Sequence, residues 1–451
     1  MRLVVVGGSD AGVAAALRVR EMESNAAVTV VLADAYPNYS ICGLPFYLSR
    51  EIEDWHRLAH RTEFDGIDVL SNHRALSVEA SGHTVGVVDS SGNSRTLSYD
   101  RLLIATGSQP VVPKISGVQL PGVFFLHTMD DSFAIDRYLR ETGCRRAAII
   151  GSGYIGLEMA DALTLRGLAV SLIGRSRSPL PTVDPQFGAV VEEELQRHGV
   201  CVHNATEVAS IVPVGRELVV SGGDLRDATD LVIVAPGVRP SAALATAAKI
   251  RVGVAGAFSV DRSMQTSAPD VFAAGDCAET WHRVLECNVY LPLGTTAHKQ
   301  GRVAGENMVG GARSFQGCVG TQVVKVFELA VARTGLRDDE ARHAGFDPVT
   351  VESTASDHKA YYPGARELRI RVTGDRLSGR LLGAQIIGHW RAQVAKRIDV
   401  FAAALFHGMQ VDGLNDLDLS YTPPLGSPWD PVQIAAQAWG HHARSTTQPL
   451  I

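Results

Sequence analysis

Cysteine pairs are absent from this sequence. Its six cysteines are scattered along the chain, at Cys42, Cys144, Cys201, Cys277, Cys287 and Cys318. They form no C-x-x-C pair, and the cysteines and histidines do not follow the spacing of a zinc motif. We therefore predict no metal site and no disulfide framework, and we expect a reducing, cytoplasmic setting.

Long apolar runs and an excess of charge of one sign are also missing. The 451 residues carry a formal net charge of −6, with 45% hydrophobic and 20% charged residues. This balance gives no electrostatic basis for binding nucleic acid. No apolar run reaches the length of a membrane span, and the chain enters a strand without a signal peptide, so no membrane partner is expected. The length suffices for two or three domains.

Two strand–turn–helix–strand units are present, about 140 residues apart. The first begins "RLVVVGGSDAG" at Arg2, and the second "RRAAIIGSGYIG" at Arg145. A glycine-rich turn between a strand and a helix is typical of a dinucleotide pyrophosphate site. The second turn fits G-x-G-x-x-G, whereas Ser9 replaces the middle glycine of the first. The candidate nucleotide contacts are Gly7, Gly8, Ser9, Asp10, Ala11 and Gly12 in the first turn and Gly151, Gly153, Tyr154, Ile155 and Gly156 in the second.

The residue that ends the second strand of each unit is expected near the adenosine ribose. In the second unit this residue is about Gly174, and Arg175 and Arg177 follow where an acid would favour NAD. Guanidinium groups suit a 2′-phosphate, so the pattern favours NADPH over NADH. Two solvated surface arginines are the alternative. In the first unit Asp34 either contacts the ribose or begins the following loop, and the sequence leaves both open.

Two further motifs identify a family resemblance that covers essentially the whole chain. "IATGSQP" (104–110) and "TSAPDVFAAGDCAE" (266–279) are similar to motifs of the FAD-dependent pyridine nucleotide–disulfide oxidoreductases. The resemblance implies bound FAD, with Asp276 bonding a ribityl hydroxyl; a helix N-cap is the alternative role for Asp276. The candidate FAD contacts in these motifs are Ala105, Thr106, Gly107, Gly275 and Asp276.

The implied fold class is α/β, with two Rossmann-like nucleotide-binding domains and a C-terminal α+β dimerisation domain. After about residue 316 the strand-like runs "TQVVKVF", "ELRIRV" and "LLGAQIIG" and one helical run set this last part apart. We expect a discontinuous FAD domain (1–112 and 239–315), an NAD(P)H domain (113–238) and the C-terminal domain (316–451).

One cysteine follows the first nucleotide unit, in "NYSICGLPFY" (38–47). This segment resembles the active site of the single-cysteine branch of the family, which includes coenzyme A-disulfide reductases, NADH oxidases, NADH peroxidases and persulfide reductases. The resemblance implies that Cys42 is a redox cysteine whose partner comes from outside the protein. A helix beginning just after Cys42 would lower the pKa of the thiol. A buried, inert cysteine is the alternative, and the other five cysteines are read as structural.

Two C-terminal segments favour one member of the branch. "HKAYYPGA" (358–365) and "DLDLSYTPPLGSPWDP" (416–431) resemble the segments that carry two catalytic tyrosines in coenzyme A-disulfide reductases, supplied there by the partner subunit of a homodimer. By that match Tyr361 or Tyr362 is one and Tyr421 the other; ordinary interface tyrosines are the alternative. Asp10 stands where NADH oxidases and peroxidases have a histidine, which disfavours peroxide chemistry.

The predicted activity is that of an FAD-dependent NAD(P)H:disulfide oxidoreductase. Its substrate would be a low-molecular-weight disulfide such as coenzyme A disulfide, reduced through a mixed disulfide on Cys42. A persulfide or polysulfide reductase and an NAD(P)H oxidase are alternatives within the branch. The chain ends about 20 residues after "SPWDP", so no appended rhodanese-like domain is expected. A flavin reductase for a protein electron carrier is the alternative from another class.

Overall fold

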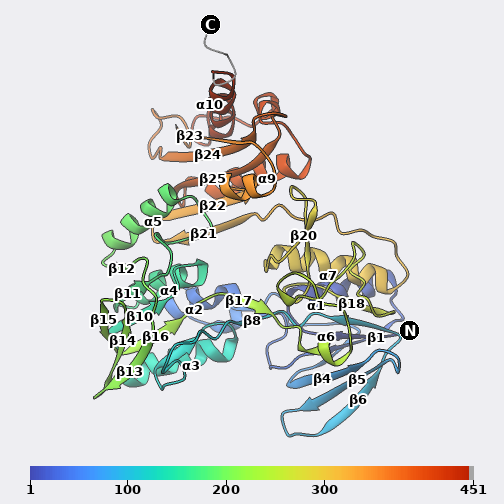
Figure 1. Ribbon diagram of the computed structural model, residues 1–451. Helices are drawn as coiled ribbons and strands as arrows, with labels where there is room; N and C mark the ends of the chain where they lie inside the picture. Colours follow the sequence, from blue (N-terminus) through green and yellow to red (C-terminus); the bar gives the residue numbers. More distant parts are fainter. Residues whose placement is uncertain (446–451) are drawn as a thin grey trace.

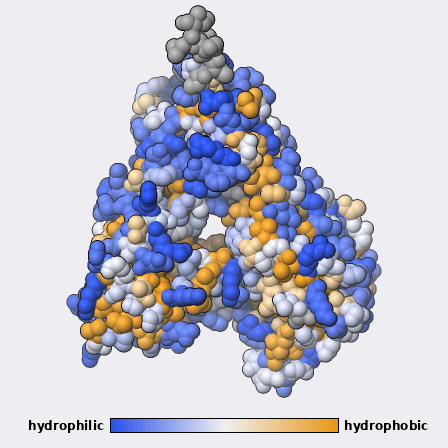
Figure 2. Space-filling view, in the orientation of Figure 1, coloured by the Kyte–Doolittle hydropathy of each residue, from blue (hydrophilic) through white to orange (hydrophobic). Residues whose placement is uncertain are grey.

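The computed structural model describes residues 1–445, which form three parts (Figure 1). The N-terminal part, coloured blue with yellow additions, lies at the lower right. The green part lies at the lower left, and the orange and red C-terminal part covers both from above. Figure 2 shows that this face of the molecule is hollowed where the three parts meet. The predicted α/β fold with two nucleotide-binding units and a separate C-terminal domain is confirmed.

The first unit is built on a five-stranded parallel sheet of order β18-β7-β1-β2-β3. Its β-branched strands are buried on both faces, as expected of a parallel sheet covered on two sides. The strands are β1 (Arg2–Val6), β2 (Ala27–Val31), β3 (Ile67–Leu70), β7 (Arg101–Ile104) and β18 (Val271–Ala273). Because β18 joins this sheet, the chain returns to its first unit after completing the second. The exact domain boundaries stay predictions.

The second unit repeats the arrangement in a second all-parallel sheet. Its order, read in the same direction as the first, is β9-β16-β10-β11-β12, so β10 takes the central place of β1. Its strands are β9 (Val123–Phe125), β10 (Arg146–Ile150), β11 (Ala169–Ile173), β12 (Cys201–His203) and β16 (Leu231–Val234). In both sheets the central strand leads into a glycine turn and a helix. Matching order in the two sheets places the two glycine turns at equivalent carboxyl edges.

The C-terminal domain contains a five-stranded antiparallel sheet of order β21-β22-β25-β24-β23. The strands are β21 (Gln322–Val326), β22 (Leu329–Gly335), β23 (Pro348–Ser356), β24 (Glu367–Asp375) and β25 (Leu381–His389). Helices α9 (Val394–Phe406) and α10 (Pro431–Ser445) share a core with this sheet. Trp439 of α10 is buried and donates its indole N–H to the Val349 carbonyl at 2.8 Å.

The remaining helices and strands surround the three sheets. The α-helices are α1 (Asp10–Met22), α2 (Leu44–Ser49), α3 (Met129–Thr142), α4 (Tyr154–Leu165), α5 (Pro185–Arg197), α6 (Ala243–Ala247), α7 (Gly294–Met308) and α8 (Asp338–His343). The 3₁₀ turns are η1 (Ile41–Gly43), η2 (Trp55–Leu58), η3 (Val254–Gly256) and η4 (Asp412–Asp416). The smaller sheets comprise β4 (His73–Glu79), β5 (Thr84–Asp89) and β6 (Ser94–Ser98); β13 (Ser210–Val214), β14 (Glu217–Gly222) and β15 (Leu225–Thr229); β8 (Ser108–Pro110) and β17 (Val238–Pro240); and β19 (Thr280–His282) and β20 (Cys287–Val289).

Two helices of the first unit pack unusually close together. A Cβ atom added to Gly301 of α7 would lie 2.1 Å from the Ala11 carbonyl oxygen of α1, and one added to Gly305 would lie 2.4 Å from that of Ala15. Only glycine permits this approach between the two backbones. The close packing holds the beginning of α7 beside the first glycine turn, where the candidate site is built.

Candidate active site

The two glycine turns have almost the same geometry. Gly7 and Gly151 have φ of +122° and +120°, a region that favours glycine. Cβ atoms added there would lie 2.0 Å from the Ala105 carbonyl oxygen and 2.2 Å from that of Ala235. A Cβ at Gly156 would lie 1.8 Å from the Gly151 oxygen, so this glycine lets the helix approach the strand. The glycines at these positions are thus required by the turn itself.

The two middle positions face open space. No atom lies within 4 Å of a Cβ added to Gly153, and the equivalent Ser9 is exposed. Ser9 and Gly153 are the N-caps of α1 and α4, and neither helix has a side-chain cap. The first backbone N–H groups of both helices therefore stay available to an anion such as a pyrophosphate.

The other predicted flavin contacts lie at the same edge of the first sheet. Strand β7 leads into Ala105–Gly107, and the neighbouring β18 leads into Gly275 and Asp276. Gly275 has φ of +81°, and a Cβ there would lie 2.9 Å from the Cβ of Ala11. Thr106 donates its hydroxyl to the Ser241 carbonyl at 2.6 Å, which fixes the crossing between the two units. Three segments far apart in the sequence therefore meet beside the first glycine turn.

Asp276 and Tyr290 are two polar side chains of this region, and the charge of Asp276 acts on the Tyr290 hydroxyl. Burial raises the pKa of Asp276 to about 6, although a hydrogen bond from the Ser108 hydroxyl at 3.3 Å lowers it. The Tyr290 hydroxyl is buried without a hydrogen-bond partner among residues 1–445. Burial raises the pKa of Tyr290, and the negative charge of Asp276 raises it further. Buried polar groups are normally hydrogen-bonded. A desolvated carboxyl and a nearby buried hydroxyl without a partner fit the hydroxyl-rich ribityl chain of FAD, so the residues present fit this cofactor.

Asp34 and the two arginines lie after the second strand of each unit. Asp34 Oδ1 accepts the backbone N–H of Tyr36 at 2.8 Å, and burial raises the pKa of this carboxyl. The Asp34 side chain therefore begins the following loop, and its contact with a ribose stays a prediction. Arg175 and Arg177 are both exposed. Gly174 is buried, and a Cβ there would lie 2.3 Å from the Ser152 hydroxyl oxygen, so a side chain at this position would have to displace that of Ser152.

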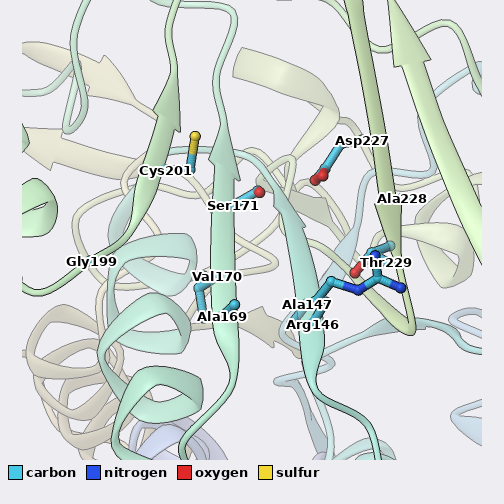
Figure 3. Close-up of a pocket in the computed structure, with 10 residues that line it drawn as sticks. All are labelled: Arg146, Ala147, Ala169, Val170, Ser171, Gly199, Cys201, Asp227, Ala228 and Thr229. Atoms are coloured by element: carbon cyan, nitrogen blue, oxygen red, sulfur yellow. The ribbon is translucent and has the colours of Figure 1, made fainter.

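Two hollows border the second sheet. The pocket in Figure 3, of about 130 Å³, lies at the amino ends of β10, β11 and β12, where Cys201 Sγ is 3.3 Å from His203 Nε2. The nucleotide turns lie at the opposite, carboxyl ends. A larger hollow, of about 1030 Å³, is lined by residues 205–209, Lys114 and Arg226. This hollow borders the loop that carries Arg175 and Arg177, because the backbone N–H of Thr206 donates to the carbonyl of Gly174, the residue before Arg175, at 2.9 Å.

Cys42 lies in the 3₁₀ turn η1, directly before α2. The side chain is exposed, but the surrounding protein desolvates the thiolate and raises the pKa of Cys42. The carboxylates of Glu158, Asp10 and Asp276 raise it further. The expectation that a helix N-terminus lowers this pKa is wrong for the chain described. Helix α2 has only six residues, and three nearby carboxylates oppose the thiolate. The same influences place Cys42 close to the predicted flavin contacts.

The two tyrosine segments meet in the C-terminal domain. The backbone N–H of Lys359 donates to the Pro423 carbonyl at 3.3 Å, and the Lys359 ammonium lies 5.4 Å from the Trp429 ring centroid. A hydrogen bond to Tyr421 raises the pKa of Tyr361, which is 72% exposed. The Tyr362 ring instead packs edge to face against the His358 ring, with the two ring centroids 5.9 Å apart. The structure therefore pairs Tyr361, rather than Tyr362, with Tyr421.

The chain matches one family over most of its length. Residues 1–301 match the pyridine nucleotide-disulphide oxidoreductases, and residues 321–430 match the dimerisation domain of that family. The chain belongs to the pyridine nucleotide-disulphide oxidoreductases. Like the family, it is an NAD(P)H-dependent flavoprotein oxidoreductase, and it carries the dimerisation domain.

Relatives of this oxidoreductase extend over nearly the whole chain. A CoA-dependent NAD(P)H sulfur oxidoreductase of Pyrococcus furiosus is 35% identical over 97% of this chain and 98% of the relative. An NADH oxidase of Methanocaldococcus jannaschii is 33% identical with the same coverage. The structure of an NAD-dependent persulfide reductase from A. fulgidus superposes with a TM-score of 0.95 and 36% identity, covering 99% of this chain and 84% of that one. The family resemblance is thus confirmed.

Three residues of this oxidoreductase site were missed by the sequence analysis: Glu158, Tyr290 and Gln300. The signal for Glu158 was visible, because two acids interrupt the otherwise apolar helix "YIGLEMADALTL" two and five residues after Gly156. Gln300 and Tyr290 gave no local signal. In residues 1–445, no helix has the length and apolar character needed to cross a bilayer. No metal-binding group of three histidine, cysteine or acidic side chains occurs in that same range.

Gln300 holds the second flavin motif in place. It is fully buried, and its Oε1 accepts the Gly275 N–H at 2.8 Å. Its Nε2 donates to the Glu279 carbonyl at 3.0 Å and to the Thr280 hydroxyl at 3.1 Å. One amide thus ties the turn carrying Asp276 to the strand that follows.

We expect Gln300→Leu to weaken FAD binding about tenfold or more, because the buried Gly275 N–H loses its partner and the turn is freed. Fluorescence titration of the apoprotein with FAD measures the change. Gln196→Leu, on an exposed position of α5, is the matched control. An unchanged dissociation constant in Gln300→Leu would contradict the role assigned to the amide.

Proposed function

We propose that this oxidoreductase reduces a low-molecular-weight disulfide, with coenzyme A disulfide as the leading candidate, through Cys42. The observation that carries the proposal is the position of Cys42. Its side chain is exposed and forms no disulfide, and it lies close to Asp10 and Asp276, at the edge of the first sheet where the predicted FAD contacts meet. All six cysteines are free, so the described chain offers Cys42 no internal disulfide. The second sulfur must then arrive with the substrate.

In the proposed cycle, Cys42 binds the substrate sulfur, and the cofactor supplies the electrons. Bound FAD would supply the two-electron relay between NAD(P)H and sulfur. The Cys42 thiolate attacks one substrate sulfur, an S–S bond forms to Cys42, and the other half leaves as a thiolate. Two electrons then break this mixed disulfide, which restores the Cys42 thiolate and releases the second half of the substrate as a thiolate. Over the cycle, NAD(P)H, one proton and RSSR give NAD(P)⁺ and two RSH.

The departing thiolate needs a proton, and the tyrosine pair is suited to give it. If Tyr361 donates its hydroxyl to the oxygen of Tyr421, the Tyr421 proton is free to reach a leaving sulfur. The exposure of Tyr361 and Tyr421 suits a surface completed by a second copy of the chain. We propose that a homodimer supplies these tyrosines in trans. Arg175 and Arg177 are exposed on the loop that the larger hollow borders, and Lys114 and Arg226 line the hollow itself. These cations support NADPH over NADH.

A persulfide is the second candidate substrate. The P. furiosus and A. fulgidus relatives are named for sulfur and persulfide reduction, and the first is CoA-dependent. Oxygen and peroxide are disfavoured, because Asp10 near Cys42 is a carboxylate rather than an imidazole.

Steady-state assays with each acceptor test the proposal. We expect NADPH consumption with coenzyme A disulfide to exceed that with polysulfide, oxygen or peroxide by about tenfold or more in kcat/KM. Mass spectrometry of protein purified without reductant is expected to show a thiol adduct on Cys42. Equal or faster turnover with polysulfide or oxygen would favour the alternatives. Parallel assays with NADH measure the cofactor preference.

A further inference from the structure

The two exposed arginines of the second unit lie on a short arch of backbone. This arginine arch, residues 175–179, begins directly after Gly174 and ends before Leu180. A Cβ added to Gly174 would lie 2.3 Å from the Ser152 hydroxyl oxygen, and the backbone N–H of Leu180 donates to the Ser152 carbonyl at 2.8 Å. Ser152 belongs to the second glycine turn. Both ends of the arch therefore lie against the turn that is expected to bind the pyrophosphate.

The backbone of the arginine arch is held in place, but its two cations are unpaired. The Ser176 carbonyl accepts the backbone N–H of Ala205, in the loop after β12, at 2.8 Å. Arg175 and Arg177 are exposed, and neither makes a hydrogen bond or ion pair with any residue between 1 and 445. Two guanidinium groups on a fixed backbone, without a counter-ion from the protein, suit a phosphate ligand.

The segment that follows the arginine arch is bound by the C-terminal domain. Arg333 of β22 donates from Nη1 to the Thr182 carbonyl at 2.7 Å. Arg337, the residue before α8, donates from Nη1 to the carbonyls of Pro181 and Val183, each at 3.2 Å. Three successive carbonyls therefore accept hydrogen bonds from two arginines. Figure 1 shows the green helix α5, which follows this segment, beside β21 and β22 of the orange sheet.

Asp184 and Glu340 complete this contact between the two parts of the chain. The backbone N–H of Asp184 donates to Gln385 Oε1 at 2.7 Å, and Asp184 Oδ2 accepts from Arg371 Nε at 2.8 Å. Glu340 of α8 accepts hydrogen bonds from both arginines that bind the three carbonyls, which offsets the repulsion between their like charges. The backbone of every residue from 181 to 184 is thus bonded to the C-terminal domain.

We propose that Arg333 and Arg337 are positioning residues for the coenzyme: by binding residues 181–184 they fix the arginine arch, and so strengthen the preference for NADPH over NADH. The inference rests on the proposed contact of Arg175 and Arg177 with the 2′-phosphate. Ordering a mobile arch at each binding event would weaken NADPH binding, and an arch that is already fixed avoids this cost. NADH has no 2′-phosphate, so it gains nothing from the two arch arginines. The C-terminal domain then takes part in coenzyme selection.

The test follows flavin reduction in the holoenzyme by stopped-flow absorbance, without oxygen or disulfide, at increasing concentrations of NADPH or NADH. The concentration dependence gives an apparent dissociation constant for each coenzyme. We expect Arg337→Leu to raise the constant for NADPH about five- to tenfold and to change that for NADH by less than about twofold. Arg342→Leu is the matched control, because Arg342 is exposed on α8 and pairs within that helix with Asp338. It should change neither constant.

A loss confined to NADPH distinguishes a positioning role from mere support of the fold. Equal weakening of both coenzymes, or no change for NADPH, in Arg337→Leu would overturn the proposal. If Arg337→Leu does not fold, Gln385→Leu takes its place, since it removes the acceptor of the Asp184 N–H. The same selective loss is expected there, and an unchanged constant for NADPH would refute the proposal.

Removal of the arch cations separates this inference from the proposed function. Arg175→Gln combined with Arg177→Gln is expected to raise the NADPH constant about a hundredfold. Arg337→Leu added to that variant should cause no further loss, because it acts through the two arginines. If the double arginine variant responds and Arg337→Leu does not, only the present inference fails. If the double variant does not respond, the proposed 2′-phosphate contact fails, and this inference fails with it.

Discussion

Cys42→Ser is expected to lower kcat with every disulfide by about a thousandfold or more, while the flavin is still reduced by NADPH at close to the wild-type rate. The reason is that a serine hydroxyl is not ionised at neutral pH and cannot form a mixed disulfide. Stopped-flow absorbance of flavin reduction and steady-state NADPH consumption measure the two halves of the cycle separately.

Cys201→Ser is the matched control for this variant. Cys201 is also exposed, but it lies in the pocket at the amino ends of the second sheet (Figure 3). Its replacement should leave both halves of the cycle unchanged within about twofold. If Cys42→Ser retained disulfide turnover, a mechanism through a mixed disulfide on Cys42 would be excluded.

Tyr361→Phe combined with Tyr421→Phe is expected to slow disulfide turnover about a hundredfold, because the leaving thiolate loses its proton donor. Flavin reduction should again be unaffected. Tyr362→Phe is the control, since the Tyr362 ring contacts His358 rather than Tyr421. We expect it to change turnover by less than about threefold.

Mixed dimers show which subunit supplies the tyrosines. Cys42→Ser chains are dissociated, mixed with equal amounts of the double tyrosine variant and reassociated. If the tyrosines act across the interface, each mixed dimer contains one intact site, and random mixing recovers about a quarter of wild-type activity. If they act within one chain, every site in the mixture is defective. No recovery after confirmed exchange would therefore contradict the arrangement in trans.

Local patterns in the sequence predicted much of the fold and the two glycine turns expected to bind the nucleotides. The strands before Gly7 and Gly151 are short β-branched runs, and the turns after them permit few conformations. The structure shows why each glycine stands there: an added Cβ at Gly7 or Gly12 would overlap a backbone oxygen. The replacement of the middle glycine by Ser9 is harmless to the turn, because Ser9 is exposed.

The ionisation of Cys42 was predicted in the wrong direction for a physical reason. A cysteine followed by a helical stretch indicates a lowered pKa only when the helix is long and no like charge is near. The acids that raise the pKa of Cys42 come from α1, α4 and the turn after β18. No pattern around residue 42 reveals them.

The sequence by itself determined the βαβ units, the single cysteine beside them and the separate C-terminal domain, because each depends on residues close together in the chain. Only the tertiary structure decided that Tyr361 meets Tyr421, that Gln300 holds Gly275, and that Lys325 reaches Asp161 across 164 positions. Such contacts depend on how distant segments pack, and side-chain charge, hydrogen bonding and desolvation take their values only once that packing exists.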